Sequence, residues 1–141
     1  MAKGAARRVI VVHSRDHARA ALAAAGELGI AVTLASPPGF AAYGGAGFFV
    51  RMIAAAGEGL ADVDHDAVLD CGGAAGHALG ALREGVTRIA IKLPRERRDR
   101  LAEIAATYGA EIMAPVRGAL DLAGEDDPAA ACRAWLSRGG R

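Results

Sequence analysis

The segment AVLDCGGAAGH, residues 67–77, places an acid, a thiol and an imidazole beside three glycines. Cys71 could be a nucleophile, because a helix N-terminus favours the thiolate and His77 or His13 could accept the proton. Asp70 could orient a histidine or accept backbone N–H groups of the loop. A structural interpretation is favoured over a reactive one, since cysteine is among the most buried residue types. Asp70, Cys71 and His77 are therefore the candidate catalytic residues.

The same segment and HSRDH, residues 13–17, could together bind an anion. Each leads into a predicted helix, whose first N–H groups and dipole favour a phosphate or a carboxylate. The glycines would let a ligand approach the backbone, although they could equally serve only the turn. The dinucleotide fingerprint and the P-loop are both absent. The candidate ligand-binding residues are His13, Ser14, Tyr43, Gly72, Gly73 and Gly76.

Lys92 offers a different chemistry, at the end of the apolar run IAIKLP. A lysine beside apolar neighbours can lose its proton and form a Schiff base with a carbonyl substrate. The four residues IKLP are similar to the lysine-bearing strand of class I keto-sugar-acid aldolases. That resemblance implies a lyase that uses Lys92, although the chain is shorter than such a barrel. The alternative is a lysine at the sheet edge that keeps its ammonium group in water.

Apolar runs alternate with segments of helical spacing, and these elements must position the candidate residues. Short apolar runs predict strands at residues 8–13, 30–35, 67–71, 88–93 and 110–114. Helical periodicity follows each run, at 16–29, near 49–56, at 74–85 and at 95–109. A last helix is expected from Asp127 as N-cap and Pro128 as its first residue.

This alternation predicts an α/β fold with a five-stranded parallel sheet. We favour a three-layer α/β/α sandwich with the flavodoxin-like strand order 2-1-3-4-5. A half (β/α)₈ barrel is the alternative, and it would leave one sheet face bare unless the protein dimerised. In the favoured order the first and third strands are neighbours. HSRDH would then lie beside DCGGAAGH at the switch point, where ligands bind in such sheets.

Composition excludes several classes of function. The 141 residues predict one domain, 1–141, with residues 1–7 disordered. A formal net charge of +1 and 4% aromatic residues argue against nucleic-acid binding. The apolar stretch 39–57 is rich in glycine and interrupted by Arg51, so we expect no membrane span. Cys71 and Cys132 lie far apart, which predicts a cytoplasmic protein with no disulfide; we expect no metal site and no cofactor.

Three functions follow from these residues. The first is binding of a small anionic metabolite, bearing phosphate or carboxylate, at the carboxyl ends of the strands, with or without catalysis. The second is a non-catalytic oligomerisation or partner-binding module, a homodimer in the simplest case, that uses the glycine and aromatic segment 39–49. The third is the Schiff-base lyase that uses Lys92.

Overall fold

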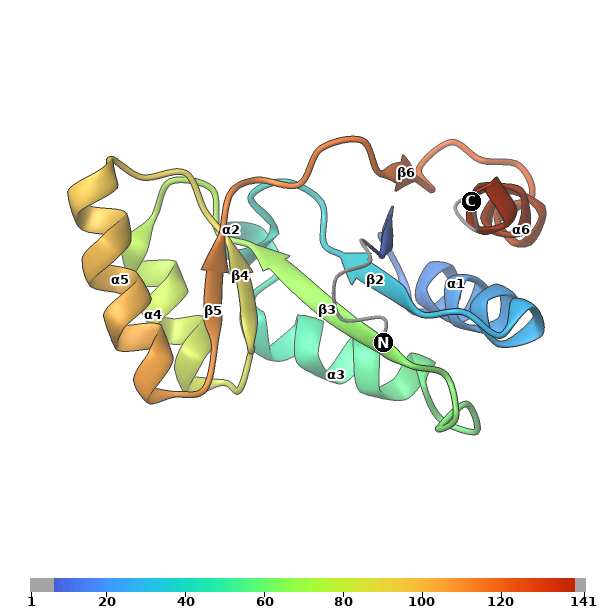
Figure 1. The fold of residues 1–141 in the computed structure, drawn as a ribbon, viewed down its shortest axis with the longest axis horizontal. Coiled ribbons are helices and arrows are strands. Elements are labelled where there is room, and N and C mark those ends of the chain that lie inside the picture. Colours follow the sequence, from blue (N-terminus) through green and yellow to red (C-terminus); the bar gives the residue numbers. More distant parts are fainter. Residues whose placement is uncertain (1–6, 139–141) are drawn as a thin grey trace.

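The computed structural model describes residues 7–138, which form six strands and six helices (Figure 1). The strands are β1 (Arg8–Val11), β2 (Val32–Ala35), β3 (His65–Asp70), β4 (Arg88–Ala90), β5 (Glu111–Met113) and β6 (Leu120–Asp121). The helices are α1 (Arg15–Leu28), α2 (Phe40–Tyr43), α3 (Ala46–Ala56), α4 (Ala75–Arg83), α5 (Arg95–Thr107) and α6 (Pro128–Arg138). Residues 1–6 of the stretch expected to be disordered lie outside the described residues, whereas Arg7 is described and pairs with Asp64.

All strands are parallel and belong to one sheet with the order β5-β4-β3-β2-β1-β6. The α/β fold with a single parallel sheet is therefore confirmed. The strand order 2-1-3-4-5 was wrong, because β2 lies between β1 and β3. Each strand from β1 to β5 is added on the same side of the one before it, as in the alternative barrel fragment. β6, which sequence analysis missed, closes the other edge of the sheet beside β1.

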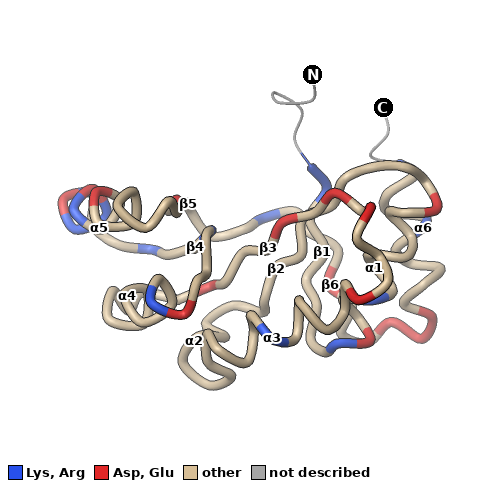
Figure 2. The backbone as a smooth tube through the Cα atoms, turned by 90° about the horizontal axis from the view of Figure 1, so that it is seen from below, with Lys and Arg blue, Asp and Glu red and all other residues tan. Residues whose placement is uncertain are grey.

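The helices cover one face of the sheet. All six contribute buried side chains to a single core cluster, including Leu22, Phe40, Phe49, Ala78, Leu101 and Leu136. The expected second helix layer is not present in the described part of the chain. Right-handed crossovers explain this, because they place every helix on the same face when consecutive strands are added in one direction. Figure 2 shows α2, α3 and α4 together on one side of the strands.

The second face, which we call the open face, carries a small apolar cluster of its own, made of Val11, Ala35, Val68 and Ala90. These side chains are buried without a helix above them. Val116 and Ala119 cover them from the connection between β5 and β6, residues 114–119, which we call the strap. The strap runs from one edge of the sheet to the other along the carboxyl ends of the strands (Figure 1).

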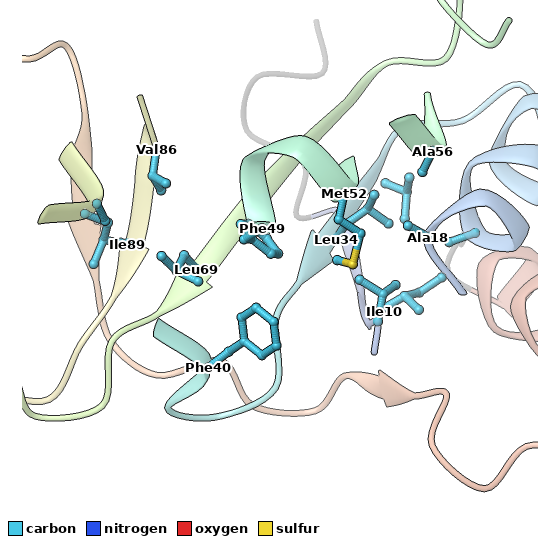
Figure 3. Packing of buried hydrophobic residues seen from close by; sticks show 14 of the residues in the cluster. Ile10, Ala18, Leu34, Phe40, Phe49, Met52, Ala56, Leu69, Val86 and Ile89 are labelled. Carbon is cyan, nitrogen blue, oxygen red and sulfur yellow. The ribbon is translucent and has the colours of Figure 1, made fainter. Parts of the chain in front are cut away.

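The helix-side core combines small side chains on α1 with aromatic rings from α2 and α3. Ala18, Ala21 and Ala25 are fully buried, which lets α1 approach the sheet closely. Phe49 of α3 lies over the sheet near Leu69 of β3 (Figure 3). The Phe40 ring of α2 belongs to the same cluster.

The Phe40 ring packs on the backbone of Gly44. The ring contacts Phe49, with centroids 6.3 Å apart, and covers Gly44. A Cβ atom added at Gly44 would lie 2.1 Å from Cζ of that ring. Gly44 has ordinary right-handed backbone angles, so the lack of a side chain, and not its conformational freedom, is what this position requires.

Gly44→Ala is therefore expected to lower the free energy of unfolding by about 1–3 kcal/mol, because the Phe40 ring must leave its place. Gly80→Ala is the matched control. Gly80 lies inside α4 with open space around it, and alanine there is expected to raise the free energy of unfolding by about 0.4–1 kcal/mol. Urea denaturation of both variants measures the difference, and equal stabilities would contradict this packing.

Candidate functional site

A pocket of about 220 Å³ lies between the open face and the strap, at the carboxyl ends of the strands. Its floor consists of side chains from the four central strands, Val11, Ala35, Val68 and Ala90. Its roof is the strap, with Val116, Gly118 and Ala119. Ser36, Pro38, Asp70 and Asp121 complete the lining. The pocket is at the edge of the sheet where a ligand was predicted, although no switch point creates it.

Small side chains explain why the space stays open. Ala35 and Ala90 are the floor residues of β2 and β4, where larger residues would reach the strap. Gly118 has a φ of 70°, a left-handed conformation that glycine adopts without strain and in which the strap turns toward β6. The pocket thus follows from small side chains on its floor and a glycine turn in its roof.

Asp70 holds two loops together at one side of the pocket. Its Oδ1 accepts hydrogen bonds from the backbone N–H groups of Gly39 and Gly72, each at 2.8 Å. The backbone N–H of Asp70 donates to Oγ of Ser36 at 2.9 Å. These bonds join the loop after β2 to the loop after β3. Among the described residues none donates to Oδ2, so this oxygen is available to a ligand.

Asp121 of β6 lies at the other side of the pocket, beyond β2 and β1. Its Oδ1 accepts a hydrogen bond from the backbone N–H of Ala123 at 2.9 Å and lies 2.7 Å from Nε2 of His13. Partial burial raises the pKa of Asp121, but the Ala123 and His13 bonds outweigh it and hold the pKa below its ordinary value. Asp121 is therefore an anion that orients the His13 ring.

His17 completes a small cluster with His13. Its Nδ1 accepts the backbone N–H of His13 at 3.1 Å, and the two rings meet edge to face with centroids 5.7 Å apart. Oγ of Ser14, the N-cap of α1, accepts the backbone N–H of His17 at 3.1 Å. Burial, and then the neighbouring His13, lower the pKa of His17, although Asp121 and Asp16 oppose them. His17 is therefore held in its neutral form as a hydrogen-bond acceptor.

Cys71 lies on the opposite side of the sheet from the pocket. It is only 2% exposed and belongs to the helix-side core. Burial, followed by the charge of Asp70, raises the pKa of its thiol to about 11. A protonated, enclosed thiol is a poor nucleophile, so the geometry favours the structural interpretation of this residue.

The other predicted site residues are dispersed. His77 is exposed at the start of α4, and Lys92 is exposed after β4. Tyr43 is 69% exposed and contacts Phe40. Ser14 is engaged as the cap of α1, and neither it nor any of the three predicted glycines, Gly72, Gly73 and Gly76, lines the pocket. Of all the predicted residues, only Asp70 lines the pocket, and His13 reaches its rim through Asp121.

The strand order explains this dispersal. With β2 between β1 and β3, HSRDH and DCGGAAGH are not neighbours. Within residues 7–138, no hydrogen bond or ion pair joins His13, Cys71 or His77 to the Asp70 side chain. Sequence analysis missed Asp121 and Ser36. The only signal for Asp121 was a brief apolar alternation in GALDLAG, and a strand of two residues is too short to recognise from a pattern.

A charged network occupies the open face at the amino ends of the strands. Asp66 accepts a hydrogen bond from Oγ1 of Thr33 at 2.5 Å and forms a salt bridge with Arg88. Arg88 also reaches Glu111 at 3.8 Å, and Arg7 pairs with both Asp64 and Asp66. These contacts link Arg7, which precedes β1, to the strands β3, β4 and β5. They fix neighbouring strands to one another and leave the pocket at the other end of the same face.

Comparison with known proteins adds no homologue. No model of a protein family matches the chain, and no curated protein is significantly similar to it in sequence. Within residues 7–138, His, Cys, Asp and Glu side chains form no group of three that could hold a metal ion. None of the helices in this described range is long and apolar enough to cross a membrane.

Because the pKa of Cys71 is about two units above the ordinary 9.0, its thiolate population at neutral pH is roughly 100-fold lower than that of a free thiol. Cys132 is buried with the same raised pKa. Native protein is therefore expected to react with an aromatic disulfide reagent at least that much more slowly than protein unfolded in urea. Fast reaction of one thiol in the native protein, lost in Cys71→Ala, would restore the nucleophile hypothesis.

The lowered pKa of His17 makes stability depend on pH. Below the ordinary value of 6.5 the unfolded chain takes up a proton at this residue before the folded protein does, so the free energy of unfolding falls as the pH decreases. His17→Gln is expected to reduce the loss of stability between about pH 7 and about pH 5. Urea denaturation at both pH values measures it, with the exposed-site variant His77→Gln as control. An unchanged pH dependence in His17→Gln would contradict the arrangement.

Proposed function

We propose that the pocket beneath the strap binds a small metabolite whose hydroxyl or amino groups donate hydrogen bonds to Asp70 and Asp121. The observation that carries this proposal is the lining itself, in which two carboxylates lie at opposite sides of an apolar floor. Pockets of this kind, apolar with a few polar groups, are typical of small-molecule sites. The volume of about 220 Å³ is below the roughly 300–1,000 Å³ common for drug-sized ligands, so a small metabolite fits best.

The charge of the lining changes the ligand class expected from sequence. The lining residues include two acids and no lysine, arginine or histidine. A phosphate or carboxylate in this space would meet two like charges, which disfavours its binding. A neutral polyol or a cationic amine is favoured instead. The location at the carboxyl ends of the strands is retained from the sequence-based hypothesis.

His13 is, as part of this proposal, a positioning residue. Its Nε2 lies 2.7 Å from Oδ1 of Asp121 and fixes that carboxylate at the side of the pocket, while His13 itself does not line the pocket. The Schiff-base hypothesis gains no support from the geometry, because Lys92 is exposed and does not line the pocket. A cytoplasmic location belongs to the same proposal and is supported by two cysteines that are both free.

An interaction surface on segment 39–49 is the second candidate function. The specific observation in its favour is the exposure of two aromatic side chains, Tyr43 and Phe48, on adjoining helices. Exposed aromatic residues are enriched at protein interfaces. This surface belongs to the helical side of the molecule, whereas the pocket belongs to the open face, so neither function excludes the other.

The first proposal is tested by thermal shift and by ¹H–¹⁵N NMR with two panels of compounds: polyols and amino sugars, and inorganic phosphate with small carboxylates. Stabilisation is expected from the first panel. Asp70→Asn keeps the Oδ1 acceptor for the loops and removes the charge, so it should weaken binding of an amine by about tenfold or more.

Asp62→Asn removes an equal charge from an exposed turn outside the pocket and is the matched control, expected to bind as the wild type does. Stabilisation by the anion panel alone, strengthened in Asp70→Asn, would overturn the ligand class. Stabilisation by neither panel would overturn the pocket as a binding site.

A further inference from the structure

The surface around the α2–α3 turn combines exposed aromatic rings with an absence of charge. Phe48 is 55% exposed and Tyr43 is 69% exposed. Both rings rest on Phe40, with centroid distances of 6.2 and 5.1 Å. The chain has no lysine, arginine, aspartate or glutamate between Glu27 and Arg51. Figure 2 accordingly shows α2 free of charged residues. We call the surface of Tyr43, Gly47 and Phe48 the aromatic patch.

Two opposite charges lie beside Gly47 within this patch. A Cβ atom placed on Gly47 would lie 3.2 Å from a guanidinium nitrogen of Arg51 and 3.4 Å from Oε1 of Glu84. Arg51 comes from α3 and Glu84 from the end of α4, and both are exposed. Neither takes part in any of the salt bridges found within residues 7–138. Both side chains therefore reach over the Gly47 backbone, which has no side chain of its own to exclude them.

We infer that the aromatic patch binds a second copy of this chain about a twofold axis that passes near Gly47. Such an interface brings the same patch of both copies together, so it must be complementary to itself. A patch that carries one positive and one negative group on either side of its centre meets this condition. Arg51 of one protomer would face the partner's Glu84, and the reverse pair would form across the axis. The two Phe48 rings would be buried between them.

The charge pattern favours a second copy over an unrelated partner. A partner of one charge would leave either Arg51 or Glu84 beside a like charge, whereas a second copy supplies the opposite charge to each. The aromatic rings would supply most of the affinity, and the charge pairs near the axis would set the register. This inference rests on the second candidate function, that segment 39–49 is an interaction surface, and it is independent of the pocket.

Sedimentation velocity over a concentration series tests the inference on the full chain. The wild type is expected to form a dimer. Phe48→Ser is expected to raise the dimer dissociation constant by about tenfold or more. Tyr108→Ser is the matched control, because Tyr108 is 50% exposed at the end of α5 and outside the patch, and its dimer should be unchanged. Circular dichroism shows whether each variant is folded.

Charge reversal tests the twofold arrangement. Arg51→Glu and Glu84→Arg are each expected to weaken the dimer, because each places like charges across the axis, and the double variant is expected to restore it. A dimer that needs Phe48 but ignores both charges would overturn the twofold register and keep the patch as an interface. A dimer that Phe48→Ser does not weaken would overturn the patch itself. A wild type that stays monomeric throughout would overturn the second copy as the occupant.

Discussion

The addition of successive parallel strands in one direction is the constraint on which the rest of this structure depends. A right-handed crossover places each helix on the same face, so the order from β1 to β5 collects all of those helices on one side. The core then forms between that face and the helices. The opposite face needs another cover, which the strap supplies above Val11, Ala35, Val68 and Ala90.

The alternation of side chains along a strand separates two residues that look like partners in the sequence. Asp70 and Cys71 are adjacent, yet Asp70 lines the pocket on the open face and Cys71 is buried under the helices. Oδ2 of Asp70 accepts no hydrogen bond from the described residues. Cys71 is a protonated thiol in an apolar core, where packing is its evident contribution.

The pocket and the aromatic patch are consequences of the same asymmetry. The open face has only a short strap above small side chains, which leaves space for a small ligand. On the helical face, α2 and α3 carry the rings of Tyr43 and Phe48. Both rings pack on the buried Phe40, but both remain exposed to solvent. The pocket and the exposed aromatic side chains thus lie on opposite sides of the sheet.

Local sequence determined the elements of this protein. Apolar runs located the five longer strands to within a few residues, and Asp127 with Pro128 located the start of α6, where Oδ1 of Asp127 accepts the N–H of Ala130. Such signals depend on neighbours in the chain. Strand order, the position of β6 and the bond between His13 and Asp121, 108 residues apart, were decided only by tertiary structure. The physical reason is that a parallel strand can pair on either edge with the same local pattern, so the choice rests on the packing of the whole sheet.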